Sequence, residues 1–229
     1  MVASVPEFPI SRADCAYTSC YCEENVWWLC KAAVDRGLGN RSFAVFVSNT
    51  HQTIPLWRQQ RAAEPAAAVV WDYHVLFVLK TQTGTFVYDL DSTLPFPCPL
   101  EDYYDLAINP EGIATRLRPN YRRLFRIIAA STFVSHFASN RSHMRRKDGT
   151  WSAPPPSYPP IVSNEGKTSM NLDSYRMMDS VSVSALDSAS NVFGLVVSED
   201  AMVNFFYNGP NMQVAVLKGS AGSSNPPSE

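Results

Sequence analysis

The chain has 229 residues, which is enough for one sizeable domain or at most two small ones. Hydrophobic residues make up 45% and charged residues 17%, and this composition excludes a wholly disordered protein. Nineteen basic residues against 21 acidic ones give a formal net charge of −2. No strong overall field therefore draws the protein to nucleic acid or to a membrane surface, and we expect neither as a partner.

The compartment follows from what the N-terminal sequence lacks. It has no basic start followed by an apolar core, so it predicts no secretory signal, and apolar runs such as residues 75–79 are too short to span a bilayer. We expect the protein in the cytoplasm, with the nucleus as a second location. In such a reducing compartment the five cysteines are expected to be core residues, metal ligands or nucleophiles rather than disulfide partners.

The composition along the chain predicts three parts. Residues 1–13 are expected to form a flexible lead-in, residues 14–207 a single domain, and residues 208–229, which are rich in Gly, Ser and Pro, a disordered tail. Because no segment has the pattern of a coiled coil, we expect a monomer.

The first clear element is a helix over residues 22–34. Val26, Leu29, Cys30 and Ala33 recur at helical spacing and predict one buried stripe. Glu23 and Glu24 fall in its first turn, where negative charge suits the helix dipole, and Gly37 follows its end.

Strand patterns follow. Short apolar runs at residues 43–48 and, more weakly, 54–58 predict strands. Residues 73–80 and 85–90 are rich in β-forming side chains and are joined by the four residues 81–84, a pattern typical of a β-hairpin.

The remaining elements are a strand over residues 121–128 and helices over 103–108, 131–138 and 198–206, with Ser131 and Ser198 as caps. Residues 139–160 are polar and then proline-rich, so we expect them to wrap the surface. Together these elements predict an α+β fold in which helices pack on an antiparallel sheet.

Cys22 occupies a place that suits a nucleophile. The N-terminus of a helix has unpaired N–H groups and a partial positive charge, which lower the pKa of a thiol. The same N–H groups can stabilise the oxyanion that forms when a thiolate attacks a carbonyl carbon.

Hairpin geometry relates His74 to Asp89. If the loop has four residues, Leu76 faces Asp89, and Asp89 then lies diagonal to His74 on the same face of the sheet. His74 can act as the base for Cys22, and Asp89 can orient the imidazole. A structural cysteine and a packed histidine would give the same pattern, and the other histidines, His51, His136 and His143, are rival bases.

The sequence gives less support to two other kinds of site, a metal site and a nucleic-acid site. The spacing of Cys15, Cys20, Cys22 and Cys30 does not match a paired zinc-ligand framework, and we expect neither a metal nor an organic cofactor. Tyr121 and Phe125 lie between five arginines, a pattern found in nucleic-acid sites, but we interpret it as the solvated face of an edge strand. The arginines are Arg116, Arg118, Arg122, Arg123 and Arg126.

Beyond these local patterns, the chain resembles the protein N-terminal glutamine amidohydrolases. The resemblance is carried by CAYTSCYCEENVW at residues 15–27, WDYHV at 71–75, YDLD at 88–91 with LPFPC at 94–98, and FASNRSHM at 137–144. It continues through Trp151, the proline-rich residues 154–159, residues 170–172 and residues 178–179. Residues 180–189 and the tail from residue 208 depart from the family pattern.

The resemblance implies a papain-like or transglutaminase-like fold with the nucleophile at a helix N-terminus. It places the catalytic triad on Cys22, His74 and Asp89. The implied reaction converts the N-terminal glutamine of a protein or peptide to glutamate with release of ammonia, upstream of an N-degron degradation pathway. The implied mechanism passes through a thioester and needs no cofactor.

Selection of a chain terminus requires a group that binds the free α-ammonium. Glu24, Asp72 and Asp91 are the candidate carboxylates, and residues 142–144 are expected to form one wall of the pocket. Two alternatives stay open at this point. One is another cysteine acyl-transfer enzyme, either a transglutaminase or a peptidase, and the other is a non-catalytic module that binds N-terminal residues.

Overall fold

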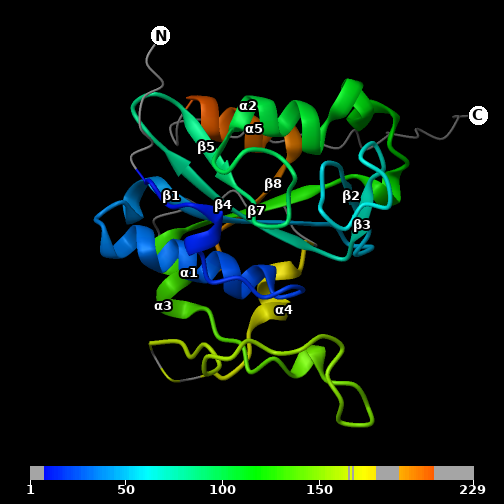
Figure 1. The fold of residues 1–229 in the computed structure, drawn as a ribbon. Coiled ribbons are helices and arrows are strands. Elements are labelled where there is room, and N and C mark those ends of the chain that lie inside the picture. The colour runs from blue at the N-terminus through cyan, green and yellow to red at the C-terminus, as the bar shows by residue number, and fades with distance from the viewer. Residues whose placement is uncertain (1–7, 165, 167, 179–190, 209–229) are drawn as a thin grey trace, which may run out of the picture.

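The computed structural model describes residues 8–164, 166, 168–178 and 191–208. Its centre is a six-stranded sheet with the strand order β6-β5-β4-β1-β7-β8, in which every neighbouring pair is antiparallel (Figure 1). A separate ribbon pairs β2 with β3. The predicted α+β class with an antiparallel sheet is confirmed.

The strands are β1 (Ser42–Ser48), β2 (Ile54–Leu56), β3 (Val69–Trp71), β4 (His74–Lys80), β5 (Thr85–Tyr88), β6 (Cys98–Pro99), β7 (Leu124–Ala129) and β8 (Leu195–Ser198). The α-helices are α1 (Cys22–Asp35), α2 (Leu100–Tyr103), α3 (Ala130–His136), α4 (Leu172–Arg176) and α5 (Glu199–Asn208). Helix α2 continues into a π-helical turn (Tyr104–Ile108), and 3-10 turns cover Arg12–Asp14, Gly39–Arg41, Pro110–Arg116, Pro119–Tyr121 and Ser142–Met144. Among the described residues, no helix is both long and apolar enough to cross a bilayer.

Helices cover both faces of the sheet, with α1, α3 and α4 on one side and α2 and α5 on the other (Figure 1). Two buried cores result. Along β1, Ala44 and Phe46 face the core under α1, whereas Val45 and Val47 face the core under α5. Strands buried on both faces need apolar side chains at every position, which explains the continuous apolar run at residues 43–47.

Helix α1 confirms the predicted helix over residues 22–34. It ends in a Schellman motif, because the Leu38 N–H bonds the Ala33 carbonyl and the Gly37 N–H bonds the Val34 carbonyl. Gly37 has φ of +75°, a left-handed conformation that glycine adopts without strain.

The predicted hairpin is also confirmed, including its register. Lys80 pairs with Thr85 and Phe77 with Tyr88, and the Thr81 N–H closes the loop on the Gly84 carbonyl. This register places the residues that follow β5 beside the start of β4.

Of the two predicted serine caps, one is confirmed and one is wrong. The Ser198 hydroxyl accepts a hydrogen bond from the Ala201 N–H at 3.3 Å at the start of α5. In contrast, α3 begins at Ala130 without a side-chain cap, since it follows β7 almost directly and Ser131 already lies inside the helix. The predicted disordered tail lies outside the described residues beyond Asn208.

The prediction of a solvated arginine face is correct for Arg116, Arg118 and Arg122 but wrong for Arg123 and Arg126. Strand β7 is not an edge strand, since β8 pairs with it, and both Arg126 within the strand and Arg123 just before it are buried. Arg123 pairs with Glu199 at 2.8 Å and also donates to two backbone carbonyls, while Arg126 donates to the carbonyls of Phe193 and Met177.

The predicted lead-in of residues 1–13 is described only from Phe8 onward. Phe8 is completely buried and packs with Phe77 and Tyr88 at ring-centroid distances of 5.7 and 5.6 Å. The Tyr88 hydroxyl also donates to the Phe8 carbonyl at 3.1 Å. At this point the chain is already part of the core under α1.

This packing makes Phe8 a stability determinant. We expect Phe8→Ala to lower the free energy of unfolding by about 3–5 kcal/mol, the usual cost of removing a buried aromatic ring. The matched control is Val162→Ala at an exposed position, which should stay within about 0.5 kcal/mol. Urea unfolding of both variants checks this, and a loss below about 1 kcal/mol for Phe8→Ala would show a loosely attached lead-in.

Candidate active site

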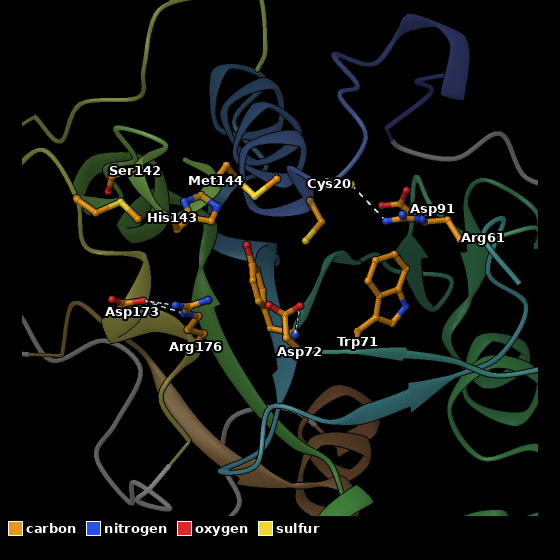
Figure 2. A pocket seen from close by; sticks show the side chains of 13 residues that line it. Cys20, Arg61, Trp71, Asp72, Asp91, Ser142, His143, Met144, Asp173 and Arg176 are labelled. Carbon is orange, nitrogen blue, oxygen red and sulfur yellow. Dashed lines mark hydrogen bonds and ion pairs between the residues drawn. The ribbon is translucent and has the colours of Figure 1, made fainter. Parts of the chain in front are cut away.

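A pocket of about 530 Å³ opens where the start of α1 meets the start of β4 (Figure 2). Its lining combines two cysteines, several charged side chains and two aromatic rings. The lining residues are Cys20, Cys22, Arg61, Trp71, Asp72, Tyr73, Asp91, Ser142, His143, Met144, Met170, Asp173 and Arg176. Residues 142–144 therefore form part of the wall, as the sequence predicted.

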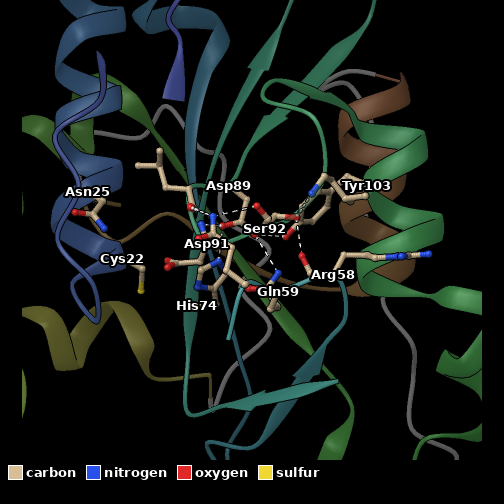
Figure 3. A network of polar contacts seen from close by, with 12 residues as sticks. Cys22, Asn25, Arg58, Gln59, His74, Asp89, Asp91, Ser92 and Tyr103 are labelled. Atoms are coloured by element: carbon tan, nitrogen blue, oxygen red, sulfur yellow. Dashed lines mark hydrogen bonds and ion pairs between the residues drawn. The ribbon is translucent and has the colours of Figure 1, made fainter. Parts of the chain in front are cut away.

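Cys22 is the first residue of α1 and is half-buried at this pocket. The backbone N–H of Val75, the residue after His74, bonds the sulfur and acts to lower the pKa of the thiol. In Figure 3, Cys22 comes from α1 on one side and Tyr103 from α2 on the other, with His74 and Asp89 between them.

His74 and Asp89 form the contact that the hairpin register predicts. The His74 Nε2 lies 2.9 Å from the Asp89 Oδ1, and both side chains are buried. Because Nε2 carries the proton of this bond, Nδ1 is the ring atom left to accept one. Nδ1 has no hydrogen-bond partner among the described residues. The Trp71 ring stacks on the imidazole at a centroid distance of 5.2 Å.

Each carboxylate oxygen of Asp89 accepts two hydrogen bonds, so all of its acceptor positions are used. Its Oδ1 also accepts from the Asp91 N–H at 3.0 Å, while Oδ2 accepts from the Tyr103 hydroxyl at 2.8 Å and from the Gln59 amide at 3.2 Å. Burial alone would raise the pKa of Asp89, but the charge of His74 and these donors lower it overall. For His74, burial acts to lower the pKa, and the Asp89 carboxylate more than offsets this, so that the pKa of His74 is raised.

The electrostatics around Cys22 differ from the sequence-based expectation. Burial raises the pKa of the thiol well above its usual range, and the carboxylates of Glu23, Asp91 and Asp72 raise it further, in that order. The helix N-terminus was expected to lower this pKa, but three acidic neighbours work against it. Burial and these carboxylates therefore favour the protonated thiol.

The site also contains three groups that resemble a metal-ligand set. One ligand atom from each of His74, Asp89 and Asp91 lies within 4.8 Å of the others, and no other such group occurs among the described residues. Both Asp89 oxygens already accept two hydrogen bonds each, so a metal would have to break this network. The residues fit an oriented imidazole better than a metal centre.

Of the predicted substrate-binding carboxylates, Glu24 is not at the pocket. Its oxygens accept from the Arg141 Nε at 3.0 Å and Nη2 at 2.9 Å, and both residues are buried. Arg141 also donates to the carbonyls of Pro156 and Tyr158. Glu24 thus attaches the proline-rich segment to α1, and its charge is already neutralised, which corrects its candidate role.

Asp72 and Asp91 do line the pocket. Asp72 is exposed and accepts from the Tyr73 N–H, whereas Asp91 is buried and accepts from the Tyr17 hydroxyl at 2.6 Å. Among the rival histidines, His51 is exposed and His136 bonds the Thr132 carbonyl within its own helix.

Four residues of the site were not identified as such from the sequence. Gln59 and Tyr103 reach Asp89 from segments with no recognisable motif, and Trp71 lies in a matching segment that indicates no role for it. For Glu23 the sequence indicates only a place in the first helical turn and in a matching segment. Its carboxylate accepts from the Tyr73 hydroxyl at 2.9 Å, and burial raises its pKa to about 7.

The structural role of Glu24 can be tested. Glu24→Gln leaves the Arg141 guanidinium buried without a counter-charge, so we expect the free energy of unfolding to fall by about 3–5 kcal/mol. Asp35→Asn in the exposed Lys31–Asp35 pair is the matched control and should cost less than about 1 kcal/mol. A Glu24→Gln variant of unchanged stability in urea unfolding would contradict this role.

Comparisons with known proteins agree on one family. The family model described as "N-terminal glutamine amidase" matches residues 17–206. Relatives named "Protein N-terminal glutamine amidohydrolase" include those of Drosophila pseudoobscura pseudoobscura, at 44% identity over 87% of this chain and 92% of that protein, and Drosophila mojavensis, at 43% over the same shares. The Drosophila grimshawi protein of that name is 49% identical over 66% of this chain and 74% of its own length. The chain belongs to the N-terminal glutamine amidase family.

Proposed function

We propose that this protein hydrolyses the side-chain amide of an N-terminal glutamine on a protein or peptide, giving N-terminal glutamate and ammonia. Family membership and the names of the relatives support the reaction. The observation that carries the mechanism is the buried His74–Asp89 pair beside a pocket that also contains the Cys22 thiol. In this proposal the three residues act as a catalytic triad.

The proposed reaction has two stages. His74 takes the thiol proton through Nδ1, and the Cys22 sulfur attacks the Cδ atom of the glutamine. The C–N bond breaks, the leaving nitrogen takes the proton from His74 and departs as ammonia, and a γ-glutamyl thioester remains on Cys22. His74 then removes a proton from water, which attacks the thioester, and glutamate leaves as the thiol is restored.

In this proposal the N–H groups at the start of α1 stabilise the oxyanion of both stages. Asp89 acts by fixing the proton of His74 on Nε2, so that Nδ1 is free to accept the thiol proton. Of the carboxylates predicted from the sequence to bind the α-ammonium, Asp72 and Asp91 are the two that line the pocket.

Several finer statements belong to the same proposal. A nucleophile at a helix start, with its histidine at the start of β4 and its acid directly after the antiparallel strand β5, supports a papain-like or transglutaminase-like fold. We infer a monomer that acts in the cytoplasm or nucleus on protein or peptide substrates, and whose glutamate product enters an N-degron pathway.

The direct test is ammonia release from a peptide that begins with glutamine, beside its N-acetylated twin. We expect release only from the free-terminus peptide, and none from the Cys22→Ala variant. Release of ammonia coupled to incorporation of an added amine would instead indicate a transglutaminase, and cleavage of the peptide bond would indicate a peptidase. A folded, reduced protein that releases no ammonia from either peptide would contradict the proposal.

The role of Asp89 gives a second test. Asp89→Asn should lower kcat by roughly 10²- to 10⁴-fold with a much smaller change in KM, because the wrong tautomer of His74 is stabilised. Asp102→Asn, at an exposed position on α2, is the matched control and should keep the unmutated kcat. A kcat for Asp89→Asn within about threefold of the unmutated protein would remove Asp89 from the mechanism.

A further inference from the structure

Glu23 is the acid in closest contact with the nucleophile, and its hydrogen bonding is incomplete. The residue is completely buried, its Oε2 accepts from the Tyr73 hydroxyl, and the same oxygen lies 3.8 Å from the Cys22 sulfur. Its Oε1 has no hydrogen-bond partner among the described residues, and the His143 Nε2 lies 3.5 Å away from it. A buried carboxylate oxygen without a hydrogen-bond donor raises the free energy of the protein, so a ligand that supplies the donor gains affinity.

Glu23 does not itself line the pocket, but side chains that contact it do. Tyr73, His143 and Cys22 all contact Glu23 and all line the pocket. His143 is labelled in Figure 2. Neither ring nitrogen of His143 has a hydrogen-bond partner among the described residues. The wall around Glu23 therefore holds two unsatisfied polar side chains in contact with each other.

The other carboxylates are less suited to bind a cation. Glu24 is neutralised by Arg141, and Asp91 already accepts a short hydrogen bond from Tyr17. Asp72 is exposed, where water screens its attraction for a charged ligand. An ion pair formed in the buried position of Glu23 is screened much less.

The substrate has the right length for this contact. In an extended glutamine the α-nitrogen lies about 5 Å from the Cδ atom, four bonds away. When Cδ is at the Cys22 sulfur, a carboxylate that binds the ammonium must therefore lie within a few ångströms of that sulfur. Glu23 meets this condition, since its nearer oxygen is 3.8 Å from the sulfur.

We propose that Glu23 recognises the free N-terminus, with its Oε1 accepting a charge-assisted hydrogen bond from the α-ammonium of the terminal glutamine. This inference rests on the proposed function and adds the residue that selects for it. A glutamine inside a chain, or one whose amine is acetylated, has no ammonium to offer and leaves the buried oxygen without a donor.

Binding at Glu23 also activates the nucleophile. Among the charged neighbours, Glu23 raises the pKa of Cys22 the most, so an ammonium docked on it offsets the charge that keeps the thiol protonated. The Cys22 proton then passes to His74 more readily when a free terminus is bound. The same contact thus contributes to both affinity and rate.

The experiment compares two peptides that differ only at the α-amino group. One begins with glutamine, and in the other the first residue is replaced by a 4-carbamoylbutanoyl group, which is glutamine without its amine. The kcat/KM for ammonia release is measured for the unmutated protein and for Glu23→Gln, Asp72→Asn and Asp91→Asn, three matched removals of one charge.

For the unmutated protein we expect the glutamine peptide to be preferred roughly 10- to 150-fold, the range for a hydrogen bond to a charged group. In Glu23→Gln the preference should fall to within about threefold, whereas Asp72→Asn should retain most of it. A preference that survives in Glu23→Gln overturns the inference, and its loss in Asp91→Asn alone would assign recognition to Asp91. If the unmutated protein releases ammonia from neither peptide, the proposed function fails first, and this inference fails with it.

The pH dependence of the preference provides a readout that needs no variant. The titratable groups around Glu23 are Tyr21, Cys22, Glu24, Tyr73 and His143, with Arg176 over the Tyr73 ring. Titrations of these groups that affect both peptides equally cancel in the ratio of the two kcat/KM values.

Because the pKa of Glu23 is about 7, this ratio of kcat/KM values should rise as pH increases to neutrality. It should fall again above about pH 8, as the α-amino group loses its proton. A ratio that stays constant between about pH 5.5 and 7.5 would overturn the inference even if Glu23→Gln does not fold.

Discussion

The buried hydrogen bond between His74 and Asp89 is the contact on which the rest of the site depends. It requires the four-residue loop of the β4–β5 hairpin, since a loop one residue longer or shorter would turn Asp89 to the other face of the sheet. It also requires α2 and the segment after β2, because Tyr103 and Gln59 fill the remaining lone pairs of Asp89. Segments distant from the hairpin in sequence are therefore needed to orient one imidazole.

The second feature of the site is the negative charge around Cys22. Four carboxylates lie near the Cys22 thiol or next to it in sequence, and they differ in burial and in hydrogen-bond partners. Arg141 neutralises the charge of Glu24 and also donates a hydrogen bond to the proline-rich segment. Asp72 and Asp91 line the pocket instead. Glu23 stays buried beside the sulfur without a counter-charge. The carboxylates around the thiol suit a substrate that carries a positive terminus, and they disfavour the thiolate form of Cys22.

Much of this arrangement could be predicted from the sequence, because it depends on local rules. Helical spacing gave α1, and strand patterns with a four-residue loop gave the hairpin, its register and the meeting of His74 with Asp89. The errors concern contacts between distant segments. Burial of Arg123 and Arg126 depends on a strand near the C-terminus that covers β7, and the pairing of Glu24 depends on Arg141, 117 positions along the chain. Local sequence could not separate Glu23 from Glu24 either, since adjacent helical residues point in different directions and their partners decide their roles.

The central claim is that Cys22 forms a covalent intermediate with the glutamine side chain. The most direct measurement is rapid acid quenching of the protein during turnover of a glutamine peptide, followed by mass spectrometry of its proteolytic fragments. The account predicts an adduct on the fragment that contains Cys22, with the mass of the substrate less ammonia, and no such adduct in Cys22→Ala. An adduct on another residue while Cys22 stays unmodified and ammonia is released would contradict it.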